Sequence, residues 1–185
     1  MPALHPRDLS KAPPPVDGAV WLPLAGERFA LIDPEDFEWA MQYNWALNHG
    51  RSNKRYVVRA NPSGIKPKTP SLHRDLMNPP VGMQVDHING NPLDNRKTNL
   101  RICTRHQNVM NNSKRSGTHS IYKGVGFNKS SKRNPWTAHI RFNNITTHLG
   151  VFPTQELAAA RYDQEATKVF GAFAKLNFGC YVEKK

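Results

Sequence analysis

The segment 85–108, VDHINGNPLDNRKTNLRICTRHQN, constrains the possible fold more than any other part of the chain. Two short β-favouring runs flank a stretch rich in Asn, Asp and Gly, and a helical pattern follows them. The predicted elements are a strand over Gln84–His87, a loop over 89–97, a second strand over Asn99–Cys103, and a helix capped by Thr104 that runs to about Asn111. This order defines a ββα unit.

Four polar residues of this unit are hard to explain as packing. They are Asp86, His87, Asn99 and Asn108. Asn and Asp within 89–95 can form turns by bonding their own backbone, but that explanation does not reach these four positions. Because Asp, Asn and unpaired His resist burial, the spacing predicts oxygen and imidazole groups that converge on one point.

The composition is that of a globular and strongly basic protein. The 185 residues are 38% hydrophobic and carry a net charge of +12; residues 113–185 alone hold 12 basic and 4 acidic side chains. This balance predicts a polyanionic partner, and the chain lacks the basic amphipathic helix that a membrane-surface protein needs. No apolar run reaches 18 residues, which excludes a membrane-spanning helix. The two cysteines, Cys103 and Cys180, form no CxxC pair and favour a reducing cytoplasm.

The rest of the first half predicts smaller elements. Residues 1–18 are Pro-rich and predict a flexible lead-in. Asp33 is expected to cap a helix that begins at Pro34. The expected elements are a strand or hairpin over Trp21–Ile32, a helix over Pro34–Gln42, β runs over Tyr43–Asn48 and Arg55–Ala60, and a short ordered element over Ser71–Asn78.

A second folding unit is expected beyond a polar, basic linker at 113–120. Asn143–Asn144 predicts a two-residue hairpin turn, since Asn tolerates positive φ. The expected elements are β runs over Ile121–Asn128, Trp136–Phe142 and Ile145–Leu149, and a helix capped by Thr154 and ended by Gly171. Strand periodicity places Trp136, Ala138, Ile140 and Phe142 on one face, against that helix, and Thr137, His139 and Arg141 on the other.

The first half resembles the HNH (ββα-metal) endonucleases of the homing type, over about residues 20–112 and most densely at the four polar positions. The resemblance implies that His87 is the general base, which takes a proton from the water that attacks the scissile phosphate. It also implies that Asp86 and Asn108 hold one divalent cation, Mg²⁺ or Mn²⁺, and that Asn99 orients the His87 ring through a hydrogen bond.

Other polar residues of this half have weaker assignments. Asn108 stands where the family name implies a His, as it does in many homing members. A DNA contact is favoured over a metal ligand for His106, and a structural role is favoured for His73 of the SLHRDLM segment. Phosphate contacts are expected from Arg96, Arg101 and Arg105, with solvated surface charge as the alternative.

The second half resembles the DNA-binding domain of plant ethylene-response factors (the APETALA-two type). The matching pieces are YKGV at 122–125, WTAHIR at 136–141, HLGVF at 148–152 and ATKVFGAFAKLNF at 166–178. In that family the sheet lies in the major groove, which implies DNA contacts from Lys123, Thr137, His139, Arg141, Thr146 and His148. Gly126, Asn128, Thr146 and His148 depart from the usual plant residues, so the plant sequence preference does not transfer. The alternative for this half is a small structural domain or an RNA-binding sheet.

The sequence therefore predicts an α+β protein with an N-terminal HNH domain and a C-terminal three-stranded antiparallel sheet packed on one helix. The expected divisions are a flexible segment at 1–18, a nuclease domain at 19–112, a linker at 113–120, a DNA-binding domain at 121–179 and a tail at 180–185. The expected function is metal-dependent, site-recognising nicking of double-stranded DNA. We expect a cytoplasmic monomer without a membrane or small-molecule cofactor. The resemblance implies a phage or mobile-element origin, and for a phage-encoded protein the expected compartment is the host cytoplasm. The alternative is a transcription regulator with an inactive HNH fold.

Overall fold

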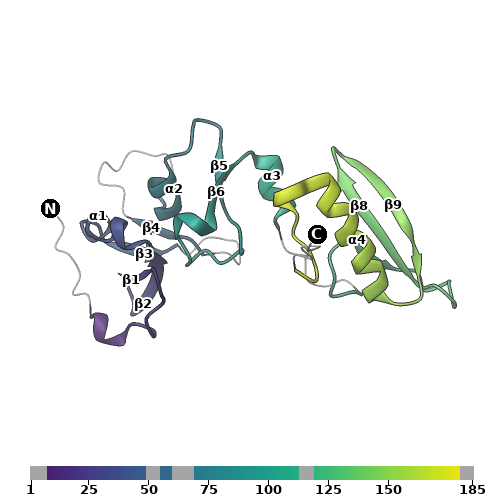
Figure 1. The fold of residues 1–185 in the computed structure, drawn as a ribbon, viewed down its shortest axis with the longest axis horizontal. Helices are drawn as coiled ribbons and strands as arrows, with labels where there is room; N and C mark the ends of the chain where they lie inside the picture. Colours follow the sequence, from purple (N-terminus) through teal and green to yellow (C-terminus); the bar gives the residue numbers. More distant parts are fainter. Residues whose placement is uncertain (1–7, 49–54, 60–68, 113–118, 180–185) are drawn as a thin grey trace. The chain divides into compact units, whose positions relative to one another are not determined.

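The computed structural model describes residues 8–48, 55–59, 69–112 and 119–179, and the chain divides into two compact units, Met1–Arg105 and His106–Lys185 (Figure 1). The linker expected at 113–120 begins several residues after the boundary between these units. Its residues 113–118 lie outside the described ones, as does the tail expected at 180–185. The α+β fold class is confirmed, because helices and antiparallel strands occur in both units.

The described part of the first unit is built from three antiparallel hairpins and short helices. Its elements are η1 (Leu9–Lys11), β1 (Val20–Leu24), β2 (Arg28–Ile32), η2 (Pro34–Asp36), α1 (Phe37–Ala40), β3 (Trp45–Leu47), β4 (Val57–Arg59), α2 (Leu72–Met77), β5 (Gln84–His87), η3 (Lys97–Asn99) and β6 (Leu100–Cys103). The strand pairs are β1–β2, β3–β4 and β5–β6, so the expected hairpin and the two strands of the ββα unit are confirmed.

Apolar residues from the first two hairpins and the short helices form the core of this unit. The buried members are Leu22, Leu24, Ala30, Ile32, Ala40, Trp45, Val57 and Leu72. Trp45 also satisfies its indole N–H, which donates to the Ala40 carbonyl at 2.8 Å. Leu72 of this core belongs to α2, which packs against both β5 and β6.

The Pro-rich segment differs from the expected flexible lead-in. Its residues 1–7 lie outside the described ones, but Leu9–Lys11 forms a short 3₁₀ helix whose N-cap Asp8 accepts from the Ser10 N–H. The Trp21 indole donates to the Pro14 carbonyl at 3.0 Å. These bonds attach the described part of the segment to β1.

Asp33 precedes a helical turn as predicted, but the helix and the capping hydrogen bond expected there are wrong. A 3₁₀ turn (η2) and then α1 replace the single helix expected over 34–42, and the Asp33 side chain makes no capping hydrogen bond. Its Oδ2 instead accepts from the Lys97 N–H at 2.7 Å. The carboxylate thus binds a loop that lies 64 residues away in the chain.

In the second unit, an antiparallel sheet packs on one helix. Its elements are α3 (Arg105–Met110, which begins at the last residue of the first unit), β7 (Val125–Phe127), β8 (Trp136–Phe142), β9 (Ile145–Phe152), α4 (Gln155–Phe170) and η4 (Gly171–Phe173), with strand order β7-β8-β9. Asn143 and Asn144 both adopt positive φ, 47° and 63°, which confirms the predicted turn. Thr154 accepts from the Leu157 N–H, and Gly171 ends α4, also as predicted.

The first strand of this sheet is shorter than the expected Ile121–Asn128, because the chain turns at Gly124 before β7 begins. Gly124 has φ +75°, and a Cβ there would lie 1.9 Å from the Tyr162 ring. Asn177 holds the same turn: its Oδ1 accepts from the Lys123 N–H and its Nδ2 donates to the Lys123 carbonyl. The Asp163 carboxylate of α4 accepts from the Asn177 N–H at 2.9 Å. One network therefore joins the YKGV and LNF segments to α4.

Candidate active site

His87 ends β5 and is buried, with 5% of its surface exposed. Its Nε2 lies 3.2 Å from the Oδ1 of Asn95, a fully buried residue that sequence reasoning did not single out. The Asn95 amide group also donates to the Pro92 carbonyl at 3.1 Å. The predicted base is thus held at one ring nitrogen by the loop between β5 and β6.

Two further rings lie against His87. The ring centroids of His73 and Tyr56 are 5.1 and 6.1 Å from that of His87, and 5.2 Å from each other. Burial, together with the electrostatic effect of the nearby His87 and Arg74 side chains, lowers the pKa of His73 to about 3. Its Nδ1 has no hydrogen-bond partner among the described residues. The His73 and Tyr56 rings limit the positions that His87 can adopt.

Asp86, the predicted metal ligand, is buried beside Arg101. The two residues are opposite each other in the β5–β6 register, and Arg101 donates from Nε and Nη2 to Asp86 Oδ2 at 3.0 and 2.8 Å. Arg101 therefore neutralises the carboxylate in this structure, whereas the sequence predicts a phosphate contact for it.

The Asn99 side chain holds the loop between β5 and β6. Its Oδ1 accepts from the Asn89 N–H, and its Nδ2 donates to Asn89 Oδ1 and to the Asp94 carbonyl, all at 2.8–3.0 Å. The role of Asn99 as the residue that orients the His87 ring stays a prediction, and the Asn95 side chain lies against that ring at Nε2.

The loop is also attached to the N-terminal hairpin. The Leu31 N–H donates to the Leu93 carbonyl at 2.8 Å, and the Asn95 N–H donates to the Leu31 carbonyl at 2.7 Å. Within the loop, Arg96 donates to both carboxylate oxygens of Asp94 at 2.8 Å, which holds the pKa of Asp94 below its usual range. Arg96 is therefore engaged inside the unit, although the sequence predicts a phosphate contact.

The remaining predicted site residues of the ββα unit lie on α3. Arg105 ends the first unit, and Asn108 belongs to the second. The convergence of Asn108 with Asp86 on one cation stays a prediction, as do the roles of Arg105 and His106. The described residues contain no group of three or more His, Cys, Asp or Glu side chains that could hold a metal ion.

The available donors nonetheless fit a hard divalent cation. Mg²⁺ is commonly bound in phosphoryl-transfer sites by one or two protein carboxylates, and waters and substrate phosphate oxygens complete its coordination. Asp86 supplies a single carboxylate of that kind, and no softer sulfur donor is required. The amide oxygen of Asn108, which belongs to the second unit, stays a predicted ligand.

The predicted DNA-contact residues of the sheet lie on β8 and β9. Register pairs Arg141 with Thr146 and His139 with His148, with a bulge at Ala138/His139. Arg141 and His148 are exposed, whereas Ala138 and Ile140 are buried among residues of α4, as predicted for the helix-facing side of β8. Phe142, predicted on the same side, is 38% exposed, and its ring lies 6.0 Å from that of Phe170 at the end of α4. The predicted contact residues of the two strands thus form a polar set that contains one arginine, Arg141.

Lys123, the other predicted DNA contact of this unit, lies in the turn before β7. Its Nζ donates to the Met110 carbonyl at 2.5 Å, and burial, together with the charge of Lys175, lowers its pKa to about 8. A cavity of about 580 Å³ in the second unit is lined by Lys123, His139 and Arg141 together with Tyr162 and Phe170. Thr137 and His139 also crowd Gly126, where a Cβ would lie 2.8 Å from Thr137 Oγ1.

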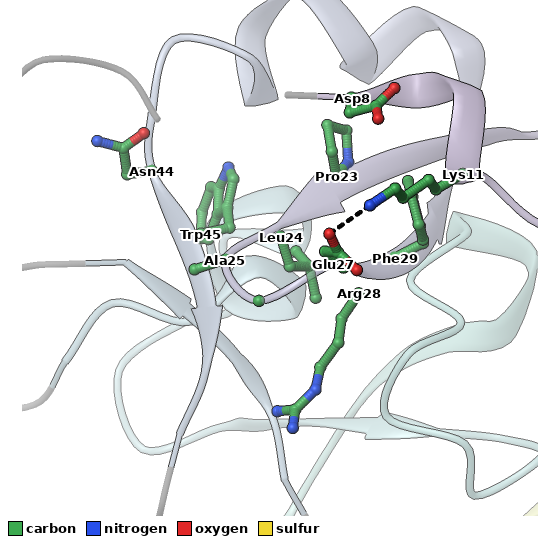
Figure 2. A pocket seen from close by; sticks show the side chains of 11 residues that line it. Asp8, Lys11, Pro23, Leu24, Ala25, Glu27, Arg28, Phe29, Asn44 and Trp45 are labelled. Carbon is green, nitrogen blue, oxygen red and sulfur yellow. Dashed lines mark hydrogen bonds and ion pairs between the residues drawn. The ribbon is translucent and has the colours of Figure 1, made fainter. Parts of the chain in front are cut away.

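A cavity of about 460 Å³ in the first unit contains none of the predicted site residues. Figure 2 shows Lys11 of η1 turned toward Glu27, with Arg28 extending away from that ion pair. Lys11 Nζ lies 2.5 Å from Glu27 Oε1. A duplex substrate binds to a surface rather than inside a cavity of this size, so this pocket does not mark the chemistry. No helix among the described residues has the length and apolar character needed to cross a membrane.

Comparison with known proteins identifies the first half of the chain. A family model described as HNH endonuclease matches residues 78–110, which include all four predicted polar positions. An uncharacterised HNH endonuclease of Acanthamoeba polyphaga mimivirus is 32% identical over 171 residues, which cover 88% of this chain and 83% of the viral protein.

Similarity to plant proteins covers a shorter region. Two ethylene-responsive transcription factors of Arabidopsis thaliana are 40% and 41% identical over 65 and 64 residues, about a third of this chain. The matched region spans 26% and 34% of those two proteins. No solved structure matches the chain. Since the viral relative aligns along most of both proteins and the family model contains the His87 motif, this chain belongs to the HNH endonuclease family.

Proposed function

We propose that this endonuclease is a site-recognising enzyme of the homing type that hydrolyses one phosphodiester bond of double-stranded DNA per binding event. The observation that carries the proposal is the setting of His87: a buried imidazole at the end of β5, next to a carboxylate and held by an amide and two rings. A preorganised base of this kind suits proton transfer from water near neutral pH.

In this proposal the chain's own residues divide the work. His87 accepts a proton from the attacking water, while Asp86 and Asn108 would hold Mg²⁺ or Mn²⁺. When bound, the cation would act as a Lewis acid on the phosphate and the leaving 3′-oxygen. Arg101 orients the Asp86 carboxylate through its two hydrogen bonds.

The second unit supplies DNA binding in this proposal. Thr137, His139 and Arg141 on β8, with Thr146 and His148 on β9, form the face that would contact the duplex. The similarity to the plant transcription factors supports this assignment. The proposed setting is the cytoplasm of a host cell, which suits the cysteine usage and the viral relative.

One active site per chain leads to a nicking enzyme if the chain acts as a monomer. Supercoiled plasmid that carries the target, incubated with the protein and Mg²⁺, should give open circle before any linear product. EDTA should stop the reaction, and Mn²⁺ should restore it. Linear product without a circular intermediate would contradict nicking by a monomer.

A second candidate function is sequence-specific DNA binding without cleavage. The similarity of the second half to plant transcription factors favours it. Cleavage mapping on genomic DNA from the source separates the two functions: a nuclease leaves breaks at defined positions, whereas a regulator protects a site and leaves both strands intact.

A further inference from the structure

We propose that Asn95 is the positioning residue of the catalytic base, and that its side-chain oxygen selects the His87 tautomer with the proton on Nε2. The inference deepens the proposed function, because it rests on His87 acting as the base. Asn95 is fully buried, and its Oδ1 lies 3.2 Å from His87 Nε2.

The orientation of the Asn95 amide settles which atom faces the ring. Its Nδ2 donates to the Pro92 carbonyl at 3.1 Å, so the oxygen is the atom turned toward His87. An amide oxygen only accepts hydrogen bonds, so the ring nitrogen opposite it must carry the proton. A neutral imidazole has one N–H, and the basic lone pair is therefore on Nδ1.

The backbone of Asn95 is held independently of its side chain. Its N–H donates to the Leu31 carbonyl of β2 at 2.7 Å, and the preceding Asp94 is bound by Arg96 and Asn89. The amide oxygen is therefore fixed in space before substrate arrives. A purely structural Asn in this loop would need only its turn bonds, whereas the Asn95 oxygen is directed at a ring that must change its charge.

The contact should matter most during the reaction. When Nδ1 takes the proton of the attacking water, the ring becomes cationic and its Nε2–H becomes a stronger donor, so the bond to Asn95 strengthens in the transition state. Removal of the acceptor should therefore lower kcat by about tenfold to a hundredfold and change the apparent DNA affinity little.

Three variants of the full chain test the assignment. Asn95→Leu keeps the approximate volume and removes the acceptor, Asn95→Asp keeps an acceptor oxygen, and Asn91→Ala removes an exposed Asx side chain from the same loop as the control. Cleavage under single-turnover conditions gives the rate, duplex binding in the presence of Ca²⁺ gives the affinity, and melting curves report folding.

The tautomer is measured separately by ¹⁵N-detected imidazole NMR on the metal-free protein. We expect Nε2–H on His87 in the wild type, Asn95→Asp and Asn91→Ala, and a mixture of tautomers in Asn95→Leu. We also expect Asn95→Asp to cleave within about tenfold of the wild type. A wild-type His87 protonated at Nδ1 would overturn the proposal even if Asn95→Leu did not fold, and so would a folded Asn95→Leu with wild-type rate and tautomer. Failure of the proposed function would show differently, as cleavage by His87→Ala.

Discussion

At the scale of single residues, the candidate site is built from polar groups that the fold keeps out of water. His87, Asp86 and Asn99 are each less than a tenth exposed, and each has a partner: Asn95, Arg101 and the Asn89–Asp94 loop respectively. Burial without such partners would cost several kcal/mol per group, so the hydrogen bonds both stabilise the loop and fix the geometry. His73 is the exception, since its Nδ1 has no partner among the described residues.

The His73 side chain should make the protein sensitive to acid. Its pKa is about 3 in the folded chain and about 6.5 when unfolded, so below pH 6.5 the unfolded state binds a proton that the folded state does not. As the pH is lowered from 6.5 to 3, this group should decrease the free energy of unfolding by up to about 1.4 kcal/mol per pH unit. The free energy of unfolding, measured with urea at several pH values, should depend less steeply on pH in His73→Gln, by the contribution of one proton. His148→Gln is the control and should keep the wild-type dependence. Equal slopes for wild type and His73→Gln would contradict the assignment.

At the scale of elements, local rules predict most of the fold correctly. The β5 strand, the Asn143–Asn144 turn and the helix between Thr154 and Gly171 follow from residues that are neighbours in the chain. The features that sequence reasoning missed depend on contacts between distant segments. Asn95 reaches His87 because Leu31 holds the loop. Asp33 stays at the N-cap of η2, but its carboxylate accepts from the distant Lys97 N–H instead of making a capping bond. No pattern within a short window encodes such contacts.

The turn before β7 gives a prediction for the second unit. Gly124→Ala should destabilise the protein by about 2 kcal/mol or more, because the new Cβ would overlap the Tyr162 ring and the backbone has φ +75°. Gly171→Ala is a matched control with positive φ and no atom within 4 Å of the new Cβ, and it should cost about 1 kcal/mol. Thermal unfolding measures both. A smaller loss for Gly124→Ala than for Gly171→Ala would show that the ring moves away without strain.

At the scale of the whole molecule, the chain combines a nuclease unit with a smaller unit that carries much of the positive charge. Residues 113–185 hold 12 of the 26 basic side chains but only 4 of the 14 acidic ones. In the proposed function this unit binds DNA, and its positive charge suits that role because phosphate contacts supply most non-specific affinity.

The sheet face should account for part of the salt dependence of binding. Arg141→Ala should weaken duplex binding and reduce the slope of log K against log salt by about 1, because one phosphate contact is lost. Lys168→Ala removes an equal charge from the exposed side of α4 and should leave the slope close to that of the wild type. Fluorescence anisotropy across a salt series measures both slopes. An unchanged slope for Arg141→Ala would exclude the β8 face as the binding surface.

The most direct test compares His87→Ala with the wild type on the same target duplex, with binding and cleavage measured in parallel. We expect the variant to bind DNA with near wild-type affinity and to lose cleavage in Mg²⁺ by at least about a thousandfold, since the base itself is removed. His119→Ala, at an exposed histidine of the second unit, should cut like the wild type. Cleavage by His87→Ala at the wild-type rate, or an equal loss of binding and cleavage, would contradict the assignment of His87 as the catalytic base.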